Sequence, residues 1–249
     1  FINQAELLVL AWAEVLNLDV AHGHIRQEID ATSTLKNKFG SKITIISGIA
    51  ATAEAATDLY QSGADCILVG VGGSPICTTR IETGCGLPTF ASLLDVAPVA
   101  RKFKKTFMPD SGVRNAGDIV KSLAAGASAI VGGFIFAGSD EAPGEKIQLN
   151  SRWYKRYNGS TSAHEKAKHV KRYAHDKSPT YTHHIEGAKS LVPYRGSVAS
   201  VVTHLLAGVR SGLTYVGARN VPQLWERAEF VQITTAGVHE NGMHDAIPA

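Results

Sequence analysis

Short apolar runs alternate with Ala-rich amphipathic stretches along the first 140 residues, and this alternation limits the fold more than any other feature. Apolar strands separated by helix-length connections are typical of a parallel sheet covered by helices, because each parallel crossover needs a connection of about a dozen residues or more. The sequence therefore predicts an α/β fold. The expected strands are residues 15–19, 43–48, 66–70, 106–110 and 129–134.

Two of the connecting stretches carry clear helix signals. Residues 52–62 and 116–125 place small and apolar side chains at helical spacing, and each is closed by a glycine. The alternation stops after residue 140 and then returns with an expected helix at 197–211 and an expected strand at 230–234. We interpret residues 1–249 as one domain.

The stretch that interrupts this alternation of strands and helices is strongly basic. Residues 151–177 hold eight Lys or Arg side chains against two acidic ones, in a polar stretch without apolar periodicity. We expect this run to be structureless. A long run of this kind inside a compact domain is often a functional lid, with a solvated surface loop as the alternative. We therefore expect a mobile basic flap at about residues 151–190.

The global charge gives no support to two classes of partner. Twenty-five Lys and Arg residues oppose 22 Asp and Glu residues, a net charge of +3, which favours neither a nucleic-acid binder nor a membrane-surface protein. The apolar stretch at residues 7–18 contains Glu14 and is shorter than the roughly 20 residues that a membrane span needs. We expect no nucleic acid and no membrane among the partners.

The three cysteines point to a reducing, cytoplasmic location. Their number is odd, they have no C-x-x-C spacing, and no secretory segment precedes them, so a disulfide framework or zinc ribbon is not expected. Cys77 lies in a loop beside hydroxyls and Arg80, where a thiolate could be stabilised; it is either a nucleophile or a buried structural thiol. Cys66, inside a strand, and Cys85, between glycines, are expected to be passive.

A glycine-rich loop follows the expected strand at 66–70. Gly70, Gly72 and Gly73 come where parallel strands end, and backbone amides can approach an anion closely at such a place. The loop does not fit the G-x-G-x-x-G dinucleotide motif, because position 75 is proline, and it has no P-loop lysine. A Rossmann fold is therefore disfavoured.

The motif around Cys77 resembles a known catalytic loop. Residues 69–88, V-G-V-G-G-S-P-I-C-T-T-R-I-E-T-G-C-G-L-P, are similar to the signature of the IMP dehydrogenase and GMP reductase family. Further segments resemble that family in the same order along nearly the whole chain: D-V-A-H-G at 19–23, P-D-S-G-V-R at 109–114, G-D at 117–118, G-G at 132–133, A-G at 137–138, P-G-E at 143–145, Y-N-G at 157–159, E-G at 186–187, V-P-Y-R-G at 192–196, G-V-R-S at 208–211 and Y-V-G-A at 215–218.

The resemblance implies a (βα)8 TIM barrel that binds a purine mononucleotide (IMP, XMP or GMP) at its carboxyl face. The five expected strands would be barrel strands four to eight, so we expect the chain to be a partial barrel with open sheet edges and a piece of a longer protein. The family also implies a homotetramer.

The resemblance further implies a set of site residues. In this family a Cys thiolate attacks C2 of the purine, and hydride passes between C2 and a nicotinamide. The implied roles are nucleophile for Cys77; proton transfer for Thr79; ribose binding for Asp110; phosphate binding for Gly112, Gly132, Gly133 and Tyr157; purine contact for the position of Ser160; and cofactor binding for Asp19, Gly70 and Gly72.

The dehydrogenase branch, favoured here, converts IMP to XMP with NAD and hydrolyses a covalent intermediate with an Arg-Tyr pair. Arg172 and Tyr173 resemble that pair, and Glu186 follows at a similar spacing. Acting as a base, the arginine would need a pKa well below about 12.5. The carboxyl-terminal run implies a K⁺ site formed by backbone oxygens of Gly72, Ser74 and Cys77 with Glu240.

Two other possibilities stay open. The reductase branch reduces GMP with NADPH and expels ammonia; Gly133, where dehydrogenases commonly have serine, and residues 214–218 resemble it. A catalytically impaired nucleotide-binding remnant is the third possibility. It is suggested by departures from the family pattern at Ser74, Pro75, Ile49, Ser111 and Ser160.

Overall fold

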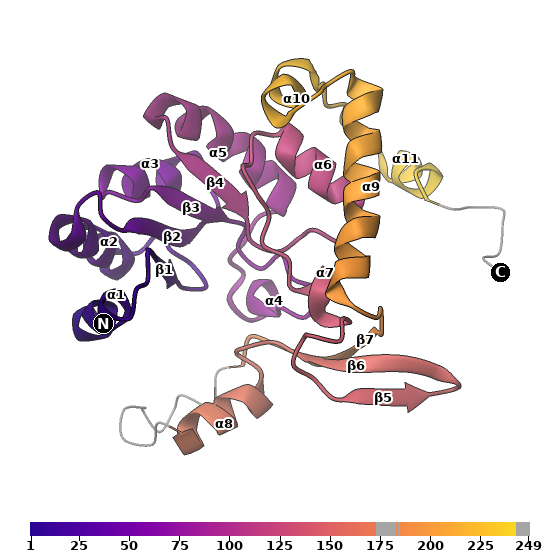
Figure 1. Ribbon diagram of the computed structural model, residues 1–249, viewed down its shortest axis with the longest axis horizontal. Helices are drawn as coiled ribbons and strands as arrows, with labels where there is room; N and C mark the ends of the chain where they lie inside the picture. The colour runs from indigo at the N-terminus through magenta and orange to yellow at the C-terminus, as the bar shows by residue number, and fades with distance from the viewer. Residues whose placement is uncertain (173–182, 184, 243–249) are drawn as a thin grey trace.

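A parallel sheet forms one part of the protein in a computed structural model, which describes residues 1–172, 183 and 185–242. Its strands lie in the order β1-β2-β3-β4, and every neighbouring pair is parallel (Figure 1). Four of the five strands expected before residue 140 are therefore confirmed, with ends shifted by up to two residues. The strands are β1 (Val15–Asp19), β2 (Thr44–Ala50), β3 (Cys66–Val69) and β4 (Thr106–Pro109).

Helices connect these strands and cover the sheet. Both expected helices in this half are present: α3 begins after Thr52, whose side chain accepts from the Ala55 amide, and α6 begins after Asn115, which accepts from the Asp118 amide. Such caps satisfy amides that a helix leaves open at its start. The helices of this region are α1 (Ile2–Leu10), α2 (Arg26–Phe39), α3 (Ala53–Gln61), α4 (Thr79–Thr83), α5 (Thr89–Phe103) and α6 (Ala116–Ala124).

The main core lies between the sheet and helices α3 and α5. Leu59, Ile67, Leu93 and Phe107 are 0–2% exposed there. Burying side chains of this size contributes about 1.5–3 kcal/mol each. This core holds the strands in parallel register, so that their carboxyl ends and the loops that follow meet at one edge.

Two expected strands are absent. Residues 129–134 form only a single parallel bridge, between Val131 and Asp110, because α7 (Phe134–Ala137) begins directly after Gly133 and ends the extended conformation. Residues 230–234 make no strand pairing in the described structure and lead into α11 (Thr235–Glu240). In both places an apolar run is present without a partner strand along its length.

The prediction that the basic run is structureless was wrong. Residues 152–158 form the central strand of a three-stranded antiparallel sheet, and most of the remaining described residues of the run form a helix (Figure 1). The basic side chains hide strand-forming aromatic residues between them. The elements are β5 (Lys146–Leu149), β6 (Arg152–Asn158), α8 (Ala163–Arg172) and β7 (Lys189–Pro193).

The first two helices that follow β7 pack against α6. The expected helix is α9 (Val198–Val216), and Gly208 and Gly212 let it approach α6 closely: a Cβ on them would lie 2.4 Å from Ala116 Cβ and 2.7 Å from Val120 Cγ2. After α9 come α10 (Val221–Arg227) and α11. Among the described residues, none of the helices has the length and apolarity to cross a membrane.

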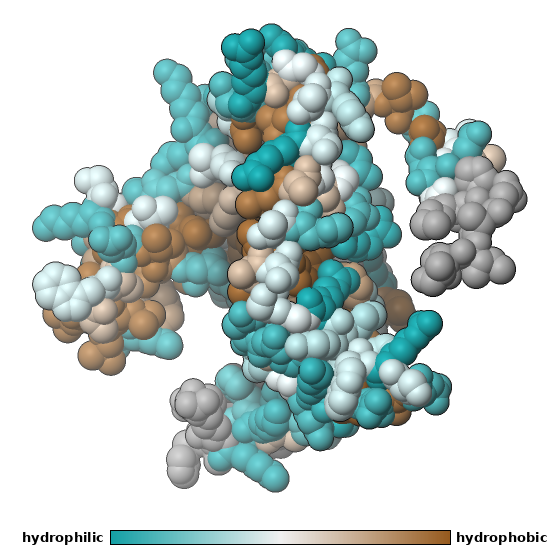
Figure 2. All heavy atoms as spheres, turned by 45° about the vertical axis from the view of Figure 1, so that its right-hand side comes forward, coloured by the Kyte–Doolittle hydropathy of each residue, from teal (hydrophilic) through white to brown (hydrophobic). Residues whose placement is uncertain are grey.

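Strand β1 lies at an edge of the parallel sheet, and exposed apolar side chains gather beside it. Leu7, Leu10 and Trp12 are 66%, 77% and 91% exposed. Figure 2 shows this hydrophobic surface at the amino-terminal end of the protein. An open edge at β1 agrees with the expectation of a partial barrel.

Candidate active site

A pocket of about 500 Å³ opens at the carboxyl ends of the parallel strands, where ligand sites of α/β proteins lie. The loops that follow β1, β3 and β4 line it, together with the start of α7 and two segments beside the antiparallel sheet. Every predicted substrate-binding residue and every predicted cofactor-binding residue lines this pocket. These residues are Asp110, Gly112, Gly132, Gly133, Tyr157 and Ser160 for substrate, and Asp19, Gly70 and Gly72 for cofactor.

Arg80 holds the glycine-rich loop in place. Its Nε and Nη2 donate to the Val71 carbonyl at 3.0 and 2.8 Å, and Nη2 also donates to the Leu87 carbonyl. Gly72, at φ +72°, passes so close to Arg80 that a Cβ would lie 2.8 Å from Arg80 Cγ. The expectation that Arg80 stabilises a Cys77 thiolate is not supported, because its donors are directed at backbone carbonyls.

Cys77 is instead the first member of a hydrogen-bonded line. Its Sγ lies 3.1 Å from Thr79 Oγ1, and that hydroxyl donates to Glu186 Oε2 at 2.6 Å. The backbone fixes this line as well: the Thr78 amide donates to the Glu186 carbonyl, and Cys77 and Gly187 form an antiparallel bridge. The structure thus brings three predicted catalytic residues together from two distant parts of the chain.

The direction of these bonds determines what the line can do. A threonine hydroxyl has one hydrogen, and Thr79 gives it to Glu186, so the oxygen presents a lone pair to Cys77. A thiol proton can therefore move to Thr79 while the Thr79 proton moves to Glu186. The line can remove a proton from a group near Sγ and return one along the same path.

Two carboxylates, those of Asp19 and Asp110, face the pocket. Among the described residues, neither Asp19 nor Asp110 accepts a side-chain hydrogen bond. Burial, together with the negative charge of Asp19, raises the pKa of Asp110 to about 6; burial also raises the pKa of Asp19. A partly buried carboxylate without a partner is suited to accept hydrogen bonds from ligand hydroxyls or amides.

Backbone amides and one phenol form the far end of the pocket. Within the described structure the amides of Gly112, Gly132 and Gly133 donate to no protein acceptor. The Tyr157 hydroxyl lies beside Gly133, since a Cβ on that glycine would lie 2.7 Å from Oη. Ser111 has a left-handed backbone conformation (φ +69°), which glycine adopts more easily. This end offers hydrogen-bond donors suited to an anion.

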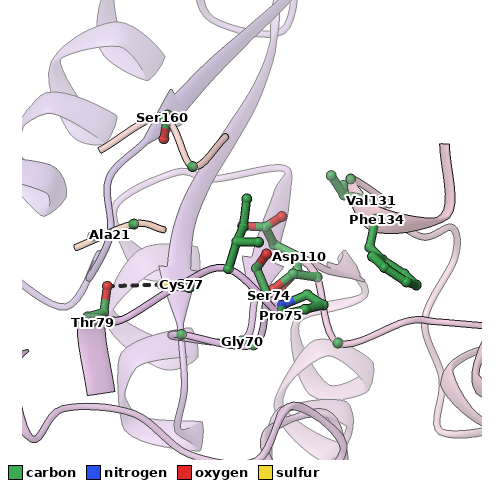
Figure 3. Close-up of a pocket in the computed structure, with 18 of the residues that line it drawn as sticks. Ala21, Gly70, Ser74, Pro75, Cys77, Thr79, Asp110, Val131, Phe134 and Ser160 are labelled. Carbon is green, nitrogen blue, oxygen red and sulfur yellow. Dashed lines mark hydrogen bonds between the residues drawn. The ribbon is translucent and has the colours of Figure 1, made fainter. Parts of the chain in front are cut away.

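These groups are spread across the pocket in a fixed order. Figure 3 shows Cys77 and Thr79 on one side, Val131 and Phe134 on the other, and Asp110 between them. The order is nucleophile, carboxylate and amide donors. A ligand with an electrophilic base, a sugar and a phosphate could meet each group in turn.

Among the described residues, Glu240 does not lie with Gly72, Ser74 and Cys77, with which it was expected to bind K⁺. Glu240 ends α11, which lies beyond α9 and apart from the glycine-rich loop, and Glu240 does not line the pocket (Figure 1). The Ser74 carbonyl accepts the Cys77 amide at 3.1 Å. Among the described residues, no three His, Cys, Asp or Glu side chains are grouped so that they could hold a metal ion. The extended segment before α11 carries Glu240 away from this pocket.

The predicted flap pair is not placed. Arg172 is the last residue of α8, and its side chain lies outside the described structure, as does all of Tyr173. The pocket also contains residues that sequence reasoning did not select, among them Phe134, Thr161 and Gly187. Gly187 had a usable sequence signal, because it adjoins Glu186. In the structure it lies close to Gly159, since a Cβ on Gly187 would be 3.2 Å from Gly159 Cα.

Comparison with known proteins agrees with this geometry. Residues 1–244 match the family model described as IMP dehydrogenase / GMP reductase domain. The chain is 42% identical over 246 residues to inosine-5'-monophosphate dehydrogenase of Aquifex aeolicus, and 39% identical over 245 residues to that of Streptococcus pyogenes. Each alignment covers 98% of this chain, which spans about half the length of these curated relatives.

A solved structure leads to the same family. The crystal structure of a GMP reductase from Trypanosoma brucei in complex with guanosine 5'-monophosphate superposes with a TM-score of 0.91 at 34% identity, covering 99% of this chain and 50% of that one. The parallel sheet with its helices is therefore part of a TIM barrel. The chain belongs to the IMP dehydrogenase / GMP reductase family, an oxidoreductase family.

Proposed function

We propose that this chain carries the catalytic site of an IMP dehydrogenase, which converts IMP, NAD⁺ and water to XMP and NADH. The observation that supports this most is the line from Cys77 through Thr79 to Glu186 at one end of a pocket whose other end offers free amides. A nucleophile, a proton path and an anion site occur in the order that a purine mononucleotide requires.

Substrate binding would use the three parts of the pocket separately. The phosphate would accept hydrogen bonds from the amides of Gly112, Gly132 and Gly133 and from the Tyr157 hydroxyl, and the ribose hydroxyls would donate to Asp110. Ionised Asp110 strengthens those bonds, since charge-assisted hydrogen bonds are about twice as strong as neutral ones. The purine would then lie with C2 near Cys77 and its edge near Ser160.

The residues fit a nicotinamide cofactor on the side of β1. Among the described residues no side chain donates to the Asp19 carboxylate, and Gly70 and Gly72 line the same pocket as Cys77. A bound NAD⁺ supplies the acceptor for the hydride that leaves C2. The proposed dehydrogenase would use NAD. The alternative reductase would use NADP.

Chemistry would proceed through a bond from Cys77 Sγ to C2. The thiol proton leaves through Thr79 toward Glu186, Sγ bonds to C2, and hydride departs from C2, which leaves a thioimidate. Water then adds to C2, its proton goes to a base, and the C2–Sγ bond breaks to release XMP. The base is Arg172 with Tyr173 by family resemblance, because Glu186 already holds the thiol proton, which it returns to Sγ through Thr79.

GMP reductase is the second candidate, and the same line favours it. In that reaction ammonia must leave C2 and needs a proton, which Glu186 can return through Thr79. No hydrolytic pair is then needed. Gly133 also agrees with this candidate, since the Tyr157 hydroxyl occupies the space where a serine side chain would start.

The activities separate in two parallel assays of the protein at its full natural length. IMP with NAD⁺ in a potassium buffer should raise the absorbance of reduced nicotinamide, and GMP with NADPH should leave it unchanged. A fall confined to the second assay would establish the reductase. Mononucleotide binding without turnover in either would establish an impaired remnant. The Cys77→Ala variant is the control, because it should stop turnover without preventing binding.

A further inference from the structure

A lysine ammonium is buried behind the donor-rich end of the pocket. Lys155 is 5% exposed, and its Nζ donates to the backbone carbonyls of Ser139 at 2.8 Å, Asp140 at 3.2 Å and Ala142. In the described part of the chain no carboxylate lies within ion-pair distance of it. An ammonium has three N–H donors, so these three carbonyls use all of them. Lys155 therefore binds the backbone of residues 139–142.

The same segment is held from its other side. The Arg195 amide donates to the Gly138 carbonyl at 2.9 Å, the Asp140 amide donates to the Gly196 carbonyl at 2.8 Å, and the Tyr194 hydroxyl donates to Asp140 Oδ1 at 2.7 Å. The backbone that follows α7 is thus fixed between β6 and the connection from β7 to α9.

Strand β6 contacts both ends of α7. Alternate residues of a strand face the same side, about 6.4–6.8 Å apart, so Lys155 and Tyr157 point the same way. Lys155 binds the segment after α7, and the Tyr157 hydroxyl lies against Gly133 at its start. Pairing with β7 keeps the strand in register, with Lys155 opposite Val192 and Tyr157 opposite Ser190.

We propose that Lys155 is a positioning residue for mononucleotide binding: its ammonium fixes β6 against residues 139–142 and thereby holds the Tyr157 hydroxyl beside Gly133. This inference rests on the proposed function, which places the substrate phosphate there. Without the three carbonyl bonds, β6 can shift relative to α7, and the Tyr157 hydroxyl no longer meets the phosphate at a fixed position.

The test compares nucleotides with nucleosides. Calorimetry on the full-length protein measures the Kd of GMP and IMP, and of guanosine and inosine, which lack the phosphate. Lys155→Met should raise the Kd of both nucleotides about tenfold, the order expected for losing one hydrogen bond to a charged group, and leave the nucleoside Kd values unchanged. Turnover should show a raised KM for the nucleotide and a kcat within about twofold.

A matched control and a double variant show whether the effect is specific. Lys189 is exposed on the neighbouring strand β7, so Lys189→Met removes the same charge and should leave every Kd unchanged. Tyr157→Phe should raise the nucleotide Kd by itself. Adding Lys155→Met to it should cause little further loss, because both changes would remove the same phosphate contact.

A second variant covers the case in which Lys155→Met does not fold. Tyr194→Phe removes an exposed hydroxyl bond to the same segment and should raise the nucleotide Kd about twofold, with no effect on nucleosides. Equal losses for nucleotide and nucleoside, or full additivity with Tyr157→Phe, would overturn the inference. If the unchanged protein binds no purine mononucleotide, the proposed function fails first, and that result is distinct from these.

Discussion

The Thr79 hydroxyl donates a 2.6 Å hydrogen bond to Glu186 Oε2, although 107 positions separate the two residues in the chain. This bond links the loop after β3 to the segment that precedes β7. It also orients the Thr79 oxygen toward Cys77. The predicted catalytic chemistry depends on this link, because it gives the Cys77 proton a route to a carboxylate.

Replacing Thr79 by valine should break that route with little change in shape. We expect kcat to fall by about 10²–10⁴, the usual contribution of a positioned acid or base, while the Kd of the mononucleotide stays within about twofold. Steady-state kinetics and calorimetry on the same preparations provide both values. A Thr79→Ser variant keeps the hydroxyl and should retain most of the activity; equal loss in both variants would contradict the proposed route.

Asp110→Asn should make the protein more stable and bind substrate less well. The raised pKa of Asp110 means that its ionised form is unfavourable in the folded state, so a neutral side chain should add about 1–2 kcal/mol to the free energy of unfolding at pH 7 after allowance for solvent screening. The Kd of the mononucleotide should rise at least about tenfold. Urea unfolding and calorimetry measure the two effects, and a less stable variant would argue against the assignment.

The raised pKa of Asp110 predicts opposite effects of pH on stability and on mononucleotide binding. Folded Asp110 has a pKa of about 6 against an ordinary value of 3.8, so its contribution to stability is present below about pH 4 and is lost as pH rises through 6. Mononucleotide binding needs the ionised form and should weaken as pH falls below about 6. Measured from pH 5 to 8, this weakening should vanish in Asp110→Asn; a variant that keeps the full slope would assign it to another group.

Ser111→Gly should stabilise the protein. Ser111 has φ +69°, where a residue with a Cβ costs roughly 1–2 kcal/mol, against about 0.5–1 kcal/mol for the extra chain entropy of glycine. The net gain in the free energy of unfolding should therefore reach about 1 kcal/mol, as measured by urea unfolding. Ser62→Gly is a matched control, since Ser62 has φ −72° and should lose stability instead.

The parallel sheet could be predicted from the sequence because its strands are buried and continuously apolar. The same reasoning failed at 129–134, where an apolar run has no partner strand along its length and turns into α7. It also failed at β6, where basic side chains lie between aromatic ones and conceal the strand. Hydropathy shows where a segment is buried, whereas strand pairing depends on neighbours that come from far along the chain.

The site was predictable in its members and less so in its contacts. Family resemblance selected Cys77, Thr79 and Glu186, but spacing alone could not show that Thr79 stands between the other two. The contacts of Arg80 were not predictable for a related reason: a long guanidinium side chain can reach several acceptors, and only the folded loop shows that it binds the Val71 carbonyl. Lys155 was counted only as part of a basic run, because the backbone carbonyls that accept its hydrogen bonds come together only in the folded segment at 139–142.

The most direct test of the account is to identify the covalent adduct. The full-length protein is mixed with IMP and NAD⁺, quenched in acid within one turnover and digested, and the peptides are analysed by mass spectrometry. We predict that the purine nucleotide is attached to Cys77, while Cys66 and Cys85 stay unmodified, and that Cys77→Ala shows no adduct. Turnover of IMP by the unchanged protein with no adduct at Cys77 in any sample, or turnover that survives Cys77→Ala, would contradict the account.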